Sequence, residues 1–167
     1  AESNGYTPST RQTGGTAVAF TGATLSFTIV YPDSDPKTNI QTRFDDTTTI
    51  LQRALWDLGI PAQRGEPPHS FCAGNHSLQF HGKLAGIAQH TTNHDATVGG
   101  IVIVNQRDET ARILNEIYSA LDYDLDPESI GSLSKTKDNL EQDTVATAIE
   151  TAFAGDNATV DRLDRKE

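Results

Sequence analysis

Apolar side chains recur at every second position between Leu25 and Tyr31. This alternation is typical of a β-strand that buries one face. The preceding segment, Arg11–Phe20, opens with a Gly-Gly pair and becomes apolar towards its end, so we expect it to be the hairpin partner of that strand. Three further short strands are predicted, at 77–80, 84–90 and 98–104.

Other segments carry apolar residues at helical spacing. This periodicity predicts helices at 44–58, 108–121 and 144–153, with Gly59 ending the first of them. A short helix is also expected at 134–140, and a terminal one at 157–165. Helices inserted among strands and appended after them predict an α+β fold, with a mixed, largely antiparallel β-sheet flanked by helices. We expect one domain over 1–167, with 122–167 as its helical C-terminal part.

The charge and composition of the chain indicate which partners it can bind and in which compartment it is found. The 167 residues carry a net charge of −10, which disfavours binding to the phosphate backbone of nucleic acids. High Asp and scarce Lys are typical of a salt-adapted protein, so we expect a halophilic source. No apolar run has membrane-spanning length, and one cysteine cannot form an internal disulfide. These features predict a cytoplasmic protein that does not enter a membrane.

The first candidate for a binding site is the Gly14-Gly15 pair, preceded by Arg11. Consecutive glycines allow backbone N–H groups to approach a ligand closely, and successive N–H groups form an anion-binding concavity. The guanidinium of Arg11 is a fork-shaped donor suited to phosphate or carboxylate. Taken alone, this pattern is more typical of an ordinary glycine turn in a hairpin.

The second candidate is Lys83, which stands among small and apolar neighbours in the sequence Gly82-Lys83-Leu84-Ala85-Gly86. Most lysines are solvated at a surface. This chain has few lysines, however, and the small neighbours leave room for a ligand beside the strand. An ammonium group in such a place can polarise an acyl carbonyl and stabilise the negative charge that develops on attack.

The third candidate is Cys72, the single cysteine, which shares the segment 69–94 with every histidine of the chain. Imidazole and thiolate are zinc ligands, so a zinc-binding module is one interpretation, although the spacings match no zinc motif. Scattered surface histidines are the alternative. A thiol in a Gly/Pro loop near a lysine is also a plausible nucleophile.

Three motifs in order give the chain a family resemblance. Its segments Arg11-Gln-Thr-Gly-Gly-Thr-Ala-Val, Thr24-Leu-Ser-Phe and Gly82-Lys-Leu-Ala-Gly-Ile-Ala-Gln are similar to the Arg-Arg-x-Ser-Gly-Gly-Gly-Ala-Val, Asn-Leu-x-Phe and Gly-x-Lys-Ile-x-Gly-x-Ala-Gln motifs of lipoate–protein ligases and lipoyl or octanoyl transferases. The resemblance covers roughly residues 6–121. It implies a biotin/lipoate ligase fold, related to class II synthetases.

The resemblance also implies a reaction and a set of site residues. Such ligases use ATP and Mg²⁺ to activate lipoate or octanoate as an acyl-adenylate. They then pass the acyl group to a lysine of a lipoyl domain, in 2-oxoacid dehydrogenase complexes or in the glycine cleavage H protein. Lys83 is expected to contact the acyl carbonyl and the adenylate phosphate. The expected binding residues are Arg11, Gly14, Gly15, Asn75, Gly82, Gly86 and Gln89.

Departures from the motifs keep other interpretations open. Thr10 stands at the position of the first Arg, Thr16 at that of the third Gly, and His76 follows Asn75 where the family has Asp. One branch of the family transfers acyl groups through a cysteine in the loop ahead of the lysine motif, where Cys72 lies. A non-catalytic homologue that binds lipoate or a lipoyl domain is a further alternative. The family's N-terminal strand region is not recognisable, so we expect a truncated chain that a separate accessory domain completes.

Overall fold

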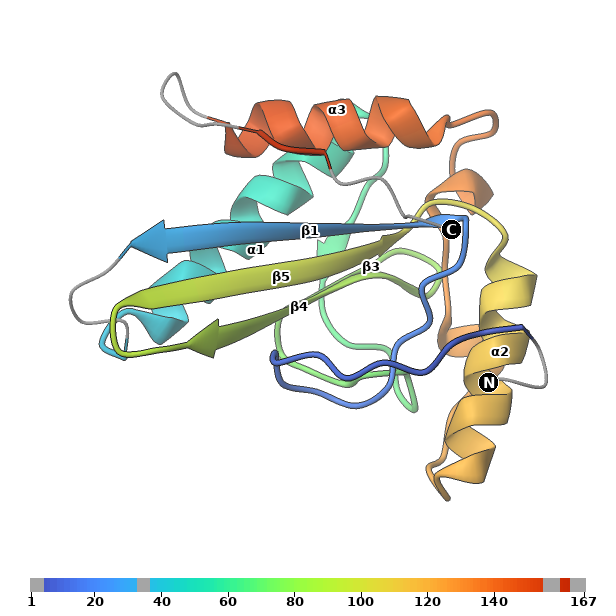
Figure 1. Ribbon diagram of the computed structural model, residues 1–167. Helices are drawn as coiled ribbons and strands as arrows, with labels where there is room; N and C mark the ends of the chain where they lie inside the picture. Colours follow the sequence, from blue (N-terminus) through green and yellow to red (C-terminus); the bar gives the residue numbers. More distant parts are fainter. Residues whose placement is uncertain (1–4, 33–36, 155–159, 163–167) are drawn as a thin grey trace.

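The computed structural model describes residues 5–32, 37–154 and 160–162 (Figure 1). Five strands form one sheet in the order β1-β5-β4-β3-β2, and every neighbouring pair is antiparallel. The strands are β1 (Thr24–Pro32), β2 (Gln63–Arg64), β3 (Ser77–Gln79), β4 (Lys83–Thr91) and β5 (Asp95–Ile103). The α-helices are α1 (Ile40–Asp57), α2 (Arg107–Ala120) and α3 (Gln142–Phe153), with 3₁₀ turns at Pro127–Ser129 and Leu133–Lys135. The predicted α+β class is confirmed.

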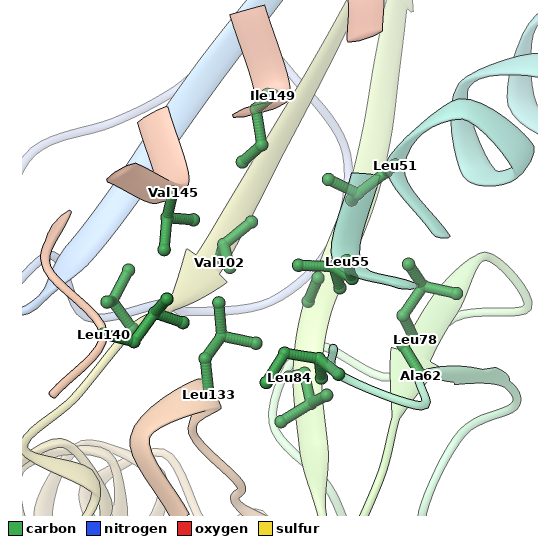
Figure 2. Packing of buried hydrophobic residues seen from close by; sticks show 13 residues of the cluster. Leu51, Leu55, Ala62, Leu78, Leu84, Val102, Leu133, Leu140, Val145 and Ile149 are labelled. Carbon is green, nitrogen blue, oxygen red and sulfur yellow. The ribbon is translucent and has the colours of Figure 1, made fainter. Parts of the chain in front are cut away.

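Side-chain alternation along β5 separates two apolar cores. Val102 faces the cluster that lies between the sheet and helices α1 and α3 (Figure 2). Ile101 and Ile103 face the opposite side, where α2 packs. The loop that carries Phe71 lies on this second side and joins that cluster.

The predicted hairpin between 11–20 and β1 is wrong. β1 pairs with β5 instead, in the register that places Phe27 opposite Gly100. Residues 11–20 form a loop because the Arg11 side chain bonds the backbone carbonyls of Thr13, Gly14 and Thr16, which bends the chain around the guanidinium. The N-terminal segment (dark blue in Figure 1) therefore passes beside the sheet and α2 without joining the strands.

The short strand β2 was not predicted, and the remaining elements lie close to their predicted positions, with two differences. The helix predicted at 134–140 is reduced to the 3₁₀ turn Leu133–Lys135, after which Leu140 packs into the first core. The helix predicted at 157–165 falls outside the described residues, apart from 160–162, which are not helical. Within the part of the chain that the structure describes, no helix is both long enough and apolar enough to cross a membrane.

Candidate active site

A cavity of about 570 Å³ opens between the N-terminal loop, the loop after Phe71, and strands β4 and β5. This volume suits a small-molecule ligand. Eight of the nine residues predicted for the site line the cavity: Arg11, Gly14, Gly15, Cys72, Asn75, Lys83, Gly86 and Gln89. Segments separated by more than 60 positions in the sequence thus meet around one space, as the motifs require.

Lys83 begins β4 and is completely buried. Its Nζ lies 3.0 Å from both carboxylate oxygens of Glu66, and it donates to the carbonyl oxygens of Phe71 and Cys72 at 2.9 Å. Burial lowers the pKa of Lys83, although the Glu66 carboxylate opposes this shift. Gly86 leaves room for the lysine, because a Cβ there would lie 3.3 Å from its Cε. A substrate oxygen that binds Nζ would take the place of one of these partners.

Glu66 is a residue that sequence reasoning missed. It lies in the Gly/Pro loop before Phe71, and its carboxylate also accepts a hydrogen bond from the Gly74 N–H at 3.3 Å. The sequence did contain a signal for it, since a lysine among small apolar residues needs a carboxylate partner when it is buried. Glu66 therefore neutralises Lys83 and ties together the two ends of the loop.

Cys72 adopts a left-handed backbone conformation, with φ of 44°. This region is uncommon for residues other than glycine and is often found at functional sites. Its thiol accepts a hydrogen bond from Arg11 Nη2 at 3.3 Å, its carbonyl is held by Lys83, and its N–H donates to the Tyr118 hydroxyl at 2.5 Å. All three polar groups of Cys72 are thus bound by other side chains.

The Gly-Gly turn brings Arg11 and Cys72 together. Gly15 has φ of +101°, and a Cβ at this position would collide with the Cys72 sulfur and with Arg11 Nη2. Gly14 has open space around it. The Arg11 guanidinium, predicted to bind a phosphate or carboxylate, here donates to three backbone carbonyls as well as to the thiol.

The sequence of residues 1–154 matches the family model of the lipoyl protein ligase A/B catalytic domain. The chain belongs to this family. The resemblance drawn from the three motifs is therefore confirmed.

Two curated relatives of the family are transferases. The chain is 25% identical to a lipoyl-[GcvH]:protein N-lipoyltransferase of Listeria monocytogenes over 150 residues, which cover 83% of the chain and 54% of that relative. It is 28% identical to an octanoyl-[GcvH]:protein N-octanoyltransferase of Exiguobacterium sp. over 116 residues, 68% of the chain and 41% of the relative. The chain thus spans about half the length, or less, of these relatives.

Solved structures of the family share the fold. A lipoate-protein ligase A bound with ATP aligns with a TM-score of 0.71 at 19% identity, covering 91% of this chain and 59% of that one. The bipartite lipoate protein ligase of Thermoplasma acidophilum aligns with a TM-score of 0.65 at 20% identity, covering 91% and 58%. The predicted biotin/lipoate ligase fold is confirmed by these neighbours.

Two residues of the lysine motif have contacts that organise the fold around the cavity. Gly82 is the predicted site residue that lies outside the lining; a Cβ on it would collide with the backbone of Ile130 and Gly131. Gln89 does line the cavity, and its amide also donates to the Ile40 carbonyl at 2.9 Å while its oxygen accepts from Arg43 at 3.1 Å. Gln89 therefore connects β4 to the start of α1.

The histidines do not gather into a metal centre. Among the described residues, no three His, Cys, Asp or Glu side chains are placed to hold a metal ion. His76 lines the cavity and stacks on Phe44, with ring centroids 4.2 Å apart and planes within 6°. His69 instead lies against Asp124, with Nδ1 2.7 Å from a carboxylate oxygen.

The family resemblance implies Mg²⁺ and ATP. Positively charged side chains of the cavity would have to bind the phosphates of ATP. Arg11 and Lys83 are the arginine and lysine of its described lining. Both donate to groups of the protein itself, and Lys83 faces the Glu66 carboxylate, which repels phosphate. As arranged, this lining is a poor fit for a triphosphate, since each cation would first have to leave its partners.

Proposed function

We propose that this chain carries the acyl-transfer site of an enzyme that moves an octanoyl or lipoyl group to a lysine of a lipoyl domain, with Cys72 as the nucleophile. The observation that carries the proposal is the position of the Cys72 thiol. It faces the cavity 3.3 Å from the Arg11 guanidinium, in a loop whose carbonyls are held by the buried Lys83. The names of the curated relatives support acyl transfer from a GcvH-type donor.

The first half-reaction loads Cys72. The thiolate attacks the carbonyl carbon of an acyl group that is amide-linked to a lysine of the donor carrier. The bond from the acyl carbon to the donor nitrogen breaks, the leaving amine takes the proton that the thiol gave up, and an acyl thioester remains on Cys72. The guanidinium beside the sulfur attracts the negative charge of the thiolate and positions it towards the cavity.

The second half-reaction unloads Cys72. The deprotonated lysine amine of the acceptor lipoyl domain attacks the thioester, the C–S bond breaks, and the proton that the amine nitrogen loses goes to the sulfur, which restores the thiol. The products are an acylated lysine and the starting enzyme, so the cycle needs neither ATP nor a redox step. Lys83 contributes by holding the carbonyls of Phe71 and Cys72, which fixes the loop during both attacks.

The relatives and the sequence together suggest the partners. We propose the glycine cleavage H protein as the donor and the lipoyl domains of 2-oxoacid dehydrogenase complexes as acceptors. Gly99 lines the cavity without a side chain, which gives the acyl chain room beside the sheet. A cytoplasmic location, predicted from composition, is compatible with such partners.

Intact-protein mass spectrometry tests the proposal. The full-length protein is incubated with octanoyl-loaded H protein, and we expect a mass increase of one octanoyl group that maps to Cys72. Cys72→Ser should abolish the adduct and the transfer, while His94→Ser, in the turn before β5, should leave both unchanged. Transfer that proceeds in the Cys72→Ser variant would contradict the proposal.

A second candidate is the ATP-dependent ligation predicted from the sequence. It is favoured by the match to the ligase A/B family and by the fold shared with a ligase bound with ATP. Pyrophosphate release that depends on both octanoate and ATP, with Cys72→Ser fully active, would establish this ligation instead. Binding of lipoate with neither an adduct nor pyrophosphate release would identify a non-catalytic homologue.

A further inference from the structure

We infer that the Tyr118 hydroxyl, together with Thr16, is a positioning device that holds Cys72 in its reactive conformation. The inference rests on the proposed role of Cys72 as the acyl acceptor. It starts from the backbone of that residue. The left-handed region is unfavourable for a residue other than glycine, so Cys72, with φ of 44°, needs bonds that favour this conformation.

One of these bonds comes from α2. The Cys72 N–H donates to the Tyr118 hydroxyl oxygen at 2.5 Å, although the two residues are 46 positions apart. The Tyr118 side chain is held in place, because it is 3% exposed and packs in the second apolar core with Phe71. The Cys72 backbone is therefore held from the helix side by Tyr118 and from the sheet side by Lys83.

The Tyr118 hydroxyl has three hydrogen-bond partners. A phenol has one proton to donate and two lone pairs that accept. Its proton goes to the Ala17 carbonyl at 3.0 Å, while the Cys72 N–H occupies one lone pair. The second lone pair can accept from the Thr16 hydroxyl at 2.6 Å, and all three bonds form together when Thr16 is the donor in that pair. Burial raises the pKa of Tyr118, so its hydroxyl keeps its proton at neutral pH.

Thr16 stands where the family motif has its third glycine, and its hydroxyl contacts the Tyr118 hydroxyl. A glycine at this position has no hydroxyl to satisfy the tyrosine. The carbonyl of Thr16 also accepts a hydrogen bond from Arg11 Nη2 at 2.8 Å, and the same Nη2 donates to the Cys72 sulfur. Thr16 thus contacts both groups that hold Cys72: the hydroxyl that bonds its backbone and the guanidinium that bonds its thiol.

The arrangement predicts which step depends on Tyr118. Removing the hydroxyl leaves the part-buried Cys72 N–H without this partner and loosens the backbone that carries the thiol. We expect loading of Cys72 to slow about tenfold, which corresponds to about 1.4 kcal/mol in the barrier for attack by the thiol. Affinity for the acyl donor is unaffected, because Tyr118 is outside the described lining of the cavity.

Single-turnover acylation of Cys72 by octanoyl-loaded H protein tests the inference, using the full-length enzyme. Tyr118→Phe and Thr16→Val should each lower the loading rate at saturating donor, Tyr118→Phe about tenfold, with little change in the donor concentration at half-saturation. Thr16→Ser keeps the hydroxyl and should load like the wild type. Tyr123→Phe, on the neighbouring exposed ring, is the matched control and should also load normally.

The combined variant and a chemical probe complete the experiment. Because the two hydroxyls act through one contact, Tyr118→Phe with Thr16→Val should be no slower than Tyr118→Phe alone. Alkylation of Cys72 by iodoacetamide should slow in parallel with loading. Wild-type loading in a folded Tyr118→Phe protein would overturn the inference and leave the role of Cys72 intact. An absence of any adduct on wild-type Cys72 would instead overturn the proposed function.

Discussion

Glu66 places both of its carboxylate oxygens 3.0 Å from Nζ of Lys83, a lysine with no exposed surface. The carboxylate is itself largely buried, with 21% of its side chain exposed. An ammonium group in this position depends on its counter-charge, because breaking a buried ion pair leaves an uncompensated charge in the interior. The two residues therefore form the electrostatic centre of the cavity.

We predict that Glu66→Gln lowers the free energy of unfolding by about 3 kcal/mol, the magnitude typical of a broken buried pair. Urea denaturation at neutral pH measures this change. Arg112→Gln is the matched control, since it removes an exposed pair on α2, with Glu116, that contributes at most about 0.5 kcal/mol. Equal losses in the two variants would show that Lys83 does not need Glu66.

Phe27 and Gly100 face each other across β1 and β5, and the aromatic ring covers the glycine. A Cβ at Gly100 would collide with the Phe27 ring, whereas a Cβ at Gly99 would meet only ordinary contacts at 3.7 and 4.0 Å. We predict that Gly100→Ala destabilises the fold by about 1–3 kcal/mol, as overpacking does, because the Phe27 ring is stacked on Phe153 of α3 and has to shift. Urea denaturation measures this loss.

Gly99→Ala supplies the control for this substitution and should leave the free energy of unfolding nearly unchanged. Phe27→Ala removes the obstructing ring, so adding Gly100→Ala to it should cost much less than in the wild type. An undiminished cost in the Phe27→Ala background would place the strain in the β5 backbone instead.

Gly82 has φ of +112°, and its Cα lies against the backbone of Ile130 and Gly131. Neither the conformation nor the contact tolerates a side chain, and backbone atoms cannot rotate away as a side chain can. We predict that Gly82→Ala costs at least about 1–3 kcal/mol of unfolding free energy. Gly14→Ala, at a position with open space and ordinary φ, should cost little in the same thermal or urea denaturation assay.

The periodicity of apolar residues in the sequence predicts those strands and helices that bury one face against a core. β1, β4 and β5 follow from apolar patterns, as do α1, α2 and α3, because each buries one face against a core. For the segment 11–20 the same reasoning gives a wrong prediction, a strand in place of the observed loop. Its apolar end does become buried, at Ala19, but its backbone bonds the Arg11 side chain rather than a neighbouring strand. Apolar character alone cannot distinguish a packed loop from a strand.

The candidate site could be predicted where a motif fixes a residue, and not where a distant side chain selects a partner. Lys83 and Cys72 stood out by residue type and neighbours. Glu66 and Tyr118 did not, because their contacts join positions 17 and 46 residues apart in the sequence. Such contacts depend on the path of the intervening loop and helix, which local pattern does not encode.

His76 gives the stability of the protein a predictable pH dependence. Burial lowers the pKa of this histidine below 6.5, the value it regains on unfolding; Asp45 partly opposes this shift and Arg64 adds to it. Between the folded and the unfolded pKa the unfolded chain binds more protons, so the free energy of unfolding rises with pH. The stabilisation is complete above the unfolded value and is lost as the pH falls through the folded one. Urea denaturation from about pH 5 to about pH 8 should reveal this slope, reduced in His76→Asn and steeper in Asp45→Asn, which loses the opposing carboxylate. An identical slope in wild type and His76→Asn would assign the acid sensitivity to other groups.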